Sequence, residues 1–231
     1  LNMWVPAETE WLPGGAWEAC QRGEYNPDDP FAGLDRRKPL AVGIDIATVE
    51  DTTAIVLAQK LGDRTVIRAR FWQNPYPYSH SMHTNWKMDP DEVIAFLRAI
   101  RAAFPAPTVR IDDRTRAGPA FLYDPMFFQL EAERLTREGF AMVEVPQTPT
   151  RLIPAAATTY EAVVSGHVEH DGNPTLAAHL ANVLPIPRGT HGWWLDKPKG
   201  SHKKIDGARA LIMAVHQSEM PVPAGHRAFV A

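Results

Sequence analysis

The sequence predicts an α/β fold, and two observations carry this prediction. Residues 40–57 form a hairpin pattern rich in β-branched residues, and strand, helix and strand patterns follow one another over residues 120–145. The second order is typical of neighbouring parallel strands, because the helix carries the chain back across the sheet. The chain has 231 residues, of which 45% are hydrophobic and 22% charged, so one domain with a sizeable core is expected.

The hairpin pattern contains an aspartate at its centre. Two apolar runs, residues 40–46 and 52–57, flank a short polar turn, and Asp45 lies in the first run. An unpaired ionised carboxylate is costly to bury in a sheet. Asp45 is therefore expected either to reach solvent at the end of the strand or to have a cation as its partner.

Residues 64–104 are expected to form a strand, a loop and a helix. Residues 64–72 alternate branched or aromatic side chains with basic ones, which predicts a third strand with one solvated face. Prolines and polar residues predict a loop over 74–86. Asp89 and Pro90 then suit the N-cap and the first position of a helix. Its core-facing stripe is expected to be Val93, Phe96, Leu97, Ile100 and Phe104.

The remaining elements follow from apolar runs and from glycine or proline boundaries. Within residues 105–119, the V-R-I sequence suits a strand, whereas the charged residues after it indicate a loop. Gly139 and Gly166 are expected to end two helices. The expected elements are strands at 120–123 and 141–145, helices at 126–138, 155–165, 173–183 and 204–217, and a hairpin at 183–195.

The first residues carry Trp4, Trp11 and Trp17 among proline, glycine and acidic residues, without a helix or strand period. We expect an arm whose tryptophans pack against the domain body or a neighbour. A base-stacking platform is the alternative, but no basic cluster accompanies the tryptophans. The expected division is an arm or linker at 1–38, one domain at 39–220 and a C-terminal tail at 221–231.

Composition narrows the class of protein. The formal net charge is −3, so a nucleic-acid partner would have to be held by a local basic patch. Cys20 is the only cysteine, which excludes an intramolecular disulfide framework and a cysteine zinc site and fits a reducing cytoplasm. No run approaches the roughly 18 apolar residues of a membrane span, and no basic-then-apolar leader opens the chain. A soluble cytoplasmic protein without a membrane partner is expected.

Three aspartates occupy comparable positions in the expected fold. Asp45 lies on the first strand, Asp124 follows an apolar strand, and Asp206 lies in the first turn of the last helix. Ends of adjacent strands lie side by side, and a helix packed across the sheet can deliver a third carboxylate. Such a group needs a counter-charge, and two divalent cations would supply it and would suit phosphodiester hydrolysis. Taken singly, the three suit a strand-end carboxylate, an Asp-Pro turn and a helix N-terminal charge.

Several motifs resemble the nuclease domain of phage terminase large subunits. In chain order they are L-N-M-W-V (1–5) with W-E-A-C (17–20), G-I-D-I-A (43–47) with E-D-T-T-A (50–54), Y-D-P (123–125), H-V-E-H-D-G-N-P (167–174) and K-I-D-G-A-R-A-L-I-M-A-V (204–215). The resemblance covers nearly the whole chain and implies an RNase H-like mixed β-sheet flanked by α-helices. It also implies metal-dependent endonucleolytic cutting of concatemeric viral double-stranded DNA during genome packaging, in the cytoplasm of the infected or lysogenic host cell.

The resemblance also carries site residues, cofactors and partners. The family's catalytic and metal-binding acids fall on Asp45, Asp124 and Asp206, with two Mg²⁺ or Mn²⁺ ions as the implied cofactors. The implied partners are double-stranded DNA, an ATPase domain, a portal and a small terminase subunit. The family's full-length proteins carry an N-terminal ATPase, but no G-x-x-x-x-G-K-[ST] phosphate loop occurs here, so this chain is not expected to translocate DNA alone.

Three other acids leave alternatives. The segment before Asp124 is unusually charged, so Asp112 or Asp113 is the alternative second metal ligand. Asp51 matches an acid of the family's first hairpin and is expected close to the site, although a turn role suits it equally.

The densest group of basic residues surrounds Asp206. Cations beside a metal site suit the phosphates of DNA, and a solvated loop and helix start is the alternative. The group consists of Lys197, Lys199, His202, Lys203, Lys204 and Arg209. Trp193 and Trp194 precede it and are expected to be packed aromatic residues of their hairpin rather than to face DNA.

Two rival functions stay open at this point. A resolvase or transposase-like nuclease of the same fold would prefer branched DNA or yield a strand-transfer product. A non-catalytic docking module of a packaging motor would neither bind divalent metal nor nick plasmid DNA.

Overall fold

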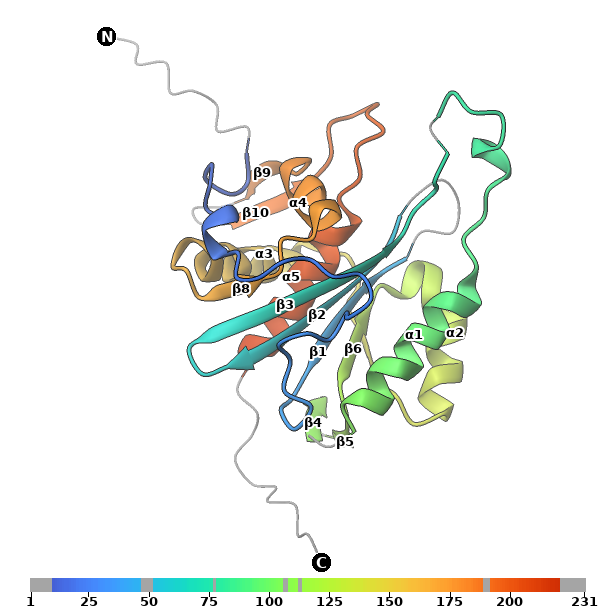
Figure 1. The fold of residues 1–231 in the computed structure, drawn as a ribbon, viewed down its shortest axis with the longest axis vertical. Coiled ribbons are helices and arrows are strands. Elements are labelled where there is room, and N and C mark those ends of the chain that lie inside the picture. The colour runs from blue at the N-terminus through green and yellow to red at the C-terminus, as the bar shows by residue number, and fades with distance from the viewer. Residues whose placement is uncertain are drawn as a thin grey trace, which may run out of the picture.

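A computed structural model describes residues 10–46, 52–76, 78–105, 108–111, 114–188 and 192–220. A six-stranded sheet with the order β7-β6-β1-β2-β3-β8 forms its centre (Figure 1). The strands are β1 (Ala41–Asp45), β2 (Thr53–Leu61), β3 (Arg64–Trp72), β6 (Ala120–Tyr123), β7 (Ala141–Glu144) and β8 (Val168–His170). Strands β1, β2 and β3 pair antiparallel, whereas β6 and β7 run parallel to β1, and β8 runs parallel to β3. The predicted α/β class with a mixed, RNase H-like sheet is confirmed.

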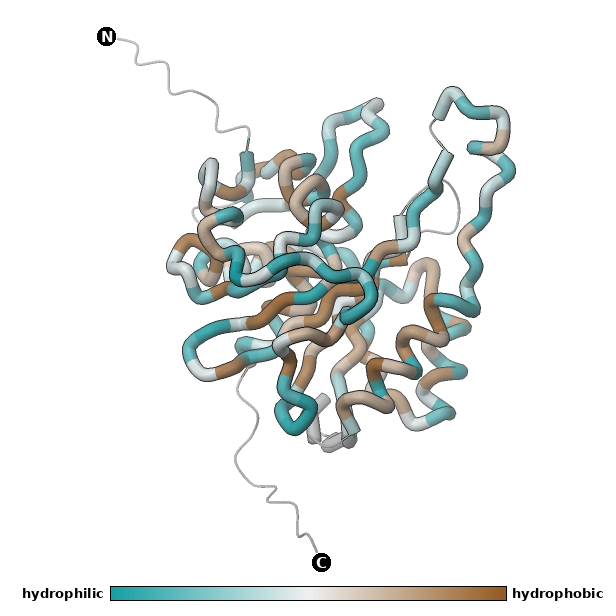
Figure 2. The backbone as a smooth tube through the Cα atoms, viewed as in Figure 1, coloured by the Kyte–Doolittle hydropathy of each residue, from teal (hydrophilic) through white to brown (hydrophobic). Residues whose placement is uncertain are grey.

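Helices cover both faces of this sheet. Helices α1 (Pro90–Ala103) and α2 (Pro125–Arg137) lie together on one face, and α3 (Pro149–Val164), α4 (Pro174–Ala181) and α5 (Asp206–Glu219) lie on the other (Figure 1). Alternation along the strands produces the two layers, because successive side chains point to opposite faces. Figure 2 shows hydrophobic residues along the central strands and the covering helices, and hydrophilic residues in the connecting loops.

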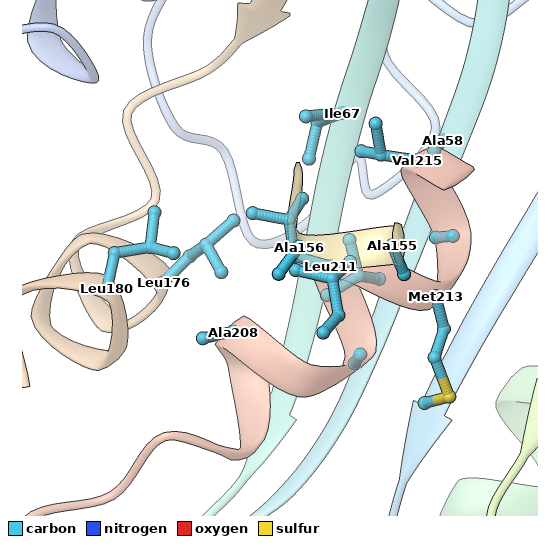
Figure 3. Packing of buried hydrophobic residues seen from close by; sticks show 14 of the residues in the cluster. Ala58, Ile67, Ala155, Ala156, Leu176, Leu180, Ala208, Leu211, Met213 and Val215 are labelled. Atoms are coloured by element: carbon cyan, nitrogen blue, oxygen red, sulfur yellow. The ribbon is translucent and has the colours of Figure 1, made fainter. Parts of the chain in front are cut away.

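The α5 face of the sheet is built from small residues. Ala41 and Ala54 pack toward α5, whereas Val42 and Ile44 pack toward α1 and α2. Helix α5 therefore approaches β1 and β2 closely. Figure 3 shows the packing around Leu211 of α5, with side chains of α3 and of the sheet nearby.

Most of the predicted elements are confirmed, and several of their ends agree with the capping signals in the sequence. Asp89 caps α1 by accepting a hydrogen bond from the amide of Asp91, and the whole predicted core stripe of that helix is buried. Gly139 and Gly166 follow α2 and α3 with φ of 89° and 68°, a conformation that favours glycine. The predicted second hairpin corresponds to β9 (Leu184–Arg188) and β10 (Gly192–Asp196).

The predicted solvated face of the third strand is only partly confirmed. Residues 65–69 of β3 are all buried, whereas Arg64 and Arg70 are exposed. Arg68 is only 6% exposed; its Nε lies 3.8 Å from Asp171 Oδ2, and its Nη1 donates to the Ile67 carbonyl. The basic residues of the strand therefore indicated contact with water correctly at Arg64 and Arg70, but not at Arg68.

Three further boundaries differ from the prediction. Within residues 105–119, V-R-I lies in β4 (Thr108–Ile111) as expected, but the charged segment expected to be a loop contains β5 (Arg114–Ala117), which pairs with β4. Helix α3 begins at Pro149 instead of residue 155, with Pro154 inside it, because burial of Leu152 and its neighbours outweighs the hydrogen bond that a proline cannot make. Strand β8 was not predicted, since three residues are too short for a recognisable period.

The described part of the N-terminal segment packs against the sheet, as predicted for its tryptophans. Trp11 and Trp17 are buried, whereas Trp4 lies outside the described residues. The Trp17 ring stacks on His170 of β8 at a centroid distance of 4.0 Å, and His170 Nε2 lies 2.8 Å from the Trp17 carbonyl oxygen. Gln21 forms a bridge with His170. In the described part of the chain, no helix has the length and hydrophobicity to cross a membrane.

Gly43 makes a contact that no other residue could make. A Cβ at this position would lie 1.9 Å from the carbonyl oxygen of Ala210 on α5. We expect Gly43→Ala to lower the free energy of unfolding by about 3 kcal/mol or more, because backbone on both sides must move apart. Urea denaturation followed by circular dichroism measures this difference.

Gly14→Ala is the matched control for that measurement. Gly14 is exposed, and the atom nearest to an added Cβ is 4.0 Å away. Its stability should stay within about 0.5 kcal/mol of the original protein. Equal stability of Gly43→Ala and Gly14→Ala would contradict the close approach of α5 to β1.

Candidate active site

Asp45 lies at the C-terminal end of β1 and is buried. Its backbone pairs with Ala54 of β2, and its side chain is 7% exposed. Oδ1 accepts a hydrogen bond of 3.3 Å from Gln147 Nε2. Oδ2 is buried and has no hydrogen-bond partner among the described residues. Asp45 therefore does not reach solvent. Of the two expectations, exposure to solvent or a cation as partner, only the second remains.

Asp124 lies beside Asp45 at the same edge of the sheet. Strand β6 is parallel to β1 with Ile44 opposite Tyr123, so the next residue along each strand is an aspartate. Asp124 is also the N-cap of α2, because its Oδ1 accepts a hydrogen bond of 3.2 Å from the Met126 amide. Asp124 therefore caps a helix and also lies beside Asp45.

Asp206 is the first residue of α5, and two other elements hold it there. The N-cap residue, Ile205, offers no side-chain hydrogen bond to the helix. Instead, the Gly207 amide donates to Nδ1 of buried His179 on α4 at 2.9 Å. A Cβ on Gly207 would lie 2.9 Å from the Phe71 ring of β3. The start of α5 is therefore clamped between α4 and the sheet.

The charges of these carboxylates act on one another. The pKa of Asp45 is raised from 3.8 to about 7, chiefly by burial and next by the Asp206 carboxylate. Arg209 lowers this pKa, Asp124 raises it, and the hydrogen bond from Gln147 lowers it. The structure thus brings the three predicted acids within electrostatic reach, and their negative charge is only partly balanced.

The negative charge of these acids suits a divalent cation, but their side chains are not arranged as a set of metal ligands. Among the residues that the structure describes, no three His, Cys, Asp or Glu side chains are grouped closely enough to hold a metal ion. Oδ2 of Asp45 is buried and has no hydrogen-bond partner in the described part of the chain, and together with the raised pKa of this carboxylate it fits a site for a cation. The donor set is all carboxylate oxygen, which suits Mg²⁺ or Mn²⁺.

Other predicted residues fall partly outside this site. Asp51, Asp112 and Asp113 lie outside the described residues, so their predicted roles stay predictions. Trp193 packs as expected, with its ring 4.7 Å from that of Tyr160 on α3. The predicted DNA-binding lysines lie in the segment that leads to Asp206, where Lys199 and Lys203 are exposed and Lys197 and Lys204 are half-buried.

Two residues enter the site differently from the prediction. Arg209 was grouped with the DNA-binding cations, but its Nη1 donates to Gln147 Oε1 and its charge acts on Asp45. Gln147 was not predicted at all. It lies in the short connection between β7 and α3, where a single glutamine carries no sequence signal. Its place follows only from the parallel order of β1, β6 and β7.

Residues 106–221, half of the chain, match the family described as "Terminase large subunit, endonuclease domain". Two curated relatives are the Gene 13 proteins of Mycobacterium phages L5 and D29, which are 24% and 26% identical. Each match covers 93% of this chain but 36% of the relative. The chain therefore spans about a third of the length of these relatives.

Solved structures share the fold at low sequence identity. The large terminase of bacteriophage HK97 has a TM-score of 0.66 at 19% identity, over 89% of this chain and 43% of that one. The large terminase nuclease of thermophilic phage G20c with bound magnesium has a TM-score of 0.59 at 13% identity, over 92% and 99% of the two chains. The same nuclease with bound cobalt scores 0.58.

Replacing the buried carboxylate by an uncharged amide should stabilise the protein above neutral pH. Because the pKa of Asp45 is higher in the folded protein, its stabilising contribution is fully present below about pH 3.8 and is lost as the pH rises to about 7. We expect Asp45→Asn to be more stable than the original protein by up to about 4 kcal/mol at pH 8. The difference should shrink toward pH 4.

Urea denaturation of both proteins from pH 4 to pH 8, in EDTA, measures this dependence. Taking the difference between the two proteins cancels the groups that titrate alike in both. A stability difference that does not change with pH would contradict the raised pKa of Asp45.

Proposed function

Because the chain belongs to the family of terminase large subunit endonuclease domains, we propose that it is a divalent-metal-dependent endonuclease. Its substrate is concatemeric viral double-stranded DNA, which it cuts during genome packaging. The observation that carries the proposal is buried Asp45, whose pKa is raised by burial, Asp206 and Asp124. Three acids from separate elements are costly to gather at one edge of a sheet unless a cation is bound there.

Asp45, Asp124 and Asp206 are the proposed catalytic residues and metal ligands. Two Mg²⁺ or Mn²⁺ ions bound by them would activate the attacking water and stabilise the departing 3′ oxygen. The G20c nuclease structure with bound magnesium supports this choice of metal. Each acid is held by rigid secondary structure, Asp45 by β1, Asp124 by the start of α2 and Asp206 by the start of α5.

DNA would reach the site along the segment that leads into α5. Lysines on this segment are proposed to contact the DNA phosphates. Such contacts do not depend on the DNA sequence and would place the DNA backbone near the acids. These residues are Lys197, Lys199, Lys203 and Lys204. The net charge of the chain is −3, so this local group would have to supply the attraction.

The chain is proposed to act as part of a larger packaging machine in the cytoplasm of the host cell. It spans 43% of the HK97 large terminase. A large terminase of a thermophilic bacteriophage, solved in complex with ATP-γ-S, has a TM-score of 0.53 to this chain. We assign the nuclease to residues 39–220, the connection to an ATPase domain to 1–38 and a tail to 221–231. A portal and a small terminase subunit are the further proposed partners.

Plasmid cleavage tests the proposed activity. The protein should nick and linearise supercoiled plasmid in Mn²⁺ or Mg²⁺ and should be inactive in EDTA. Asp45→Asn should lower the cleavage rate by at least about 1,000-fold, because an amide oxygen is a far weaker ligand for a divalent cation than a carboxylate. Gel electrophoresis of time courses gives the rates.

Asp63→Asn is the control for loss of one negative charge. Asp63 is exposed in the turn between β2 and β3, at the end of the hairpin remote from Asp45, so this variant should cut at the original rate. Full activity of Asp45→Asn, or metal-independent cutting, would contradict the proposal. A protein that neither binds Mn²⁺ nor nicks DNA would favour a docking module instead.

A further inference from the structure

Gln147 and Arg209 extend the site beyond the three acids. Gln147 follows β7, whose C-terminal end lies at the same edge of the sheet as those of β1 and β6. Arg209 lies three residues after Asp206 on α5, and therefore on the same side of that helix. Gln147 Nε2 donates to Asp45 Oδ1 at 3.3 Å, and Gln147 Oε1 accepts from Arg209 Nη1. The three side chains form a continuous chain of hydrogen bonds.

Arg209 determines which way the Gln147 amide faces. A guanidinium group has only donors, so the amide oxygen must face Arg209 and the amide NH₂ group must face Asp45. A flipped amide would oppose two donors at one end and two oxygens at the other. The chemistry of Arg209 thus fixes a donor against Oδ1 of Asp45.

This donor makes the two oxygens of Asp45 different. Oδ1 is engaged by Gln147, whereas Oδ2 is buried and unbonded among the described residues. A direct ion pair with Arg209 would engage the carboxylate itself and would compete with a cation for it. With the neutral amide between them, the positive charge of Arg209 stays one side chain away, while the polarised amide still orients the carboxylate.

We propose that Gln147 is a positioning residue that turns Oδ2 of Asp45 toward the divalent cation, and that Arg209 holds the Gln147 amide in the required orientation. The inference rests on the proposed metal-dependent function. It gives Arg209 a role at the metal site instead of at the DNA phosphates. Residues that orient a metal ligand without touching the metal commonly change its affinity by about 10- to 100-fold.

Mn²⁺ affinity, measured by isothermal titration calorimetry without DNA, tests this role. Gln147→Met removes the amide at similar side-chain length and should weaken binding about 10-fold. Arg209→Met releases the amide and should cause a similar loss, whereas Arg209→Lys keeps a donor for Oε1 and should restore most of the affinity. The double variant should be no weaker than either single variant, because both changes break the same contact.

Two controls separate the possible outcomes. Gln217→Met, eleven residues beyond Asp206 on α5, should bind Mn²⁺ as the original protein does. Unfolding curves in EDTA report whether each variant folds. If Gln147→Met does not fold, the Arg209 variants still test the contact. Unchanged affinity in both Gln147→Met and Arg209→Met would overturn the positioning role. If the original protein itself bound no Mn²⁺, the proposed function would fail instead.

Discussion

The close packing of α5 on β1 is the contact on which the rest of the site depends. Gly43 lies against the backbone of Ala210 with no room for a side chain, so helix and strand meet at backbone distance. Side chains two apart on a strand share a face, and Asp45 therefore projects toward the same helix as Gly43. The helix that makes this contact begins with Asp206. One packing contact thus brings together two acids that are far apart in the chain.

Electrostatics and stability oppose each other at this edge of the sheet. Burial, Asp206 and Asp124 all favour the neutral form of Asp45, and Arg209 and Gln147 offset them only in part. A protein selected for stability alone would place an apolar residue or an amide there. The acid is retained at a cost in folding free energy. This is common where binding or catalysis requires a charge in an unfavourable environment.

The sequence was sufficient for the elements with strong local signals. Asp89 before Pro90 and the glycines after α2 and α3 marked helix ends, because capping depends on neighbouring residues alone. The three acids could be proposed together because strand ends and a helix start have recognisable patterns. The roles of Gln147 and His179 could not be predicted. Their partners, Asp45 and Gly207, lie 102 and 28 positions away, and only the fold brings them close. Burial of Arg68 was not predicted for the same reason: its charged partner, Asp171, is far away in the sequence and only the fold brings the two together.

At the start of α5, residues that take no part in the proposed chemistry determine the position of Asp206. Gly207 has no room for a side chain beside Phe71 and His179, and its amide is bound by that histidine. None of these three residues carries a charge that the proposed reaction would use, yet together they fix where Asp206 stands. In a collection of inactive variants, α4 and β3 would therefore be represented alongside the acids themselves. Intolerance to substitution would outline the supporting framework as well as the reactive groups.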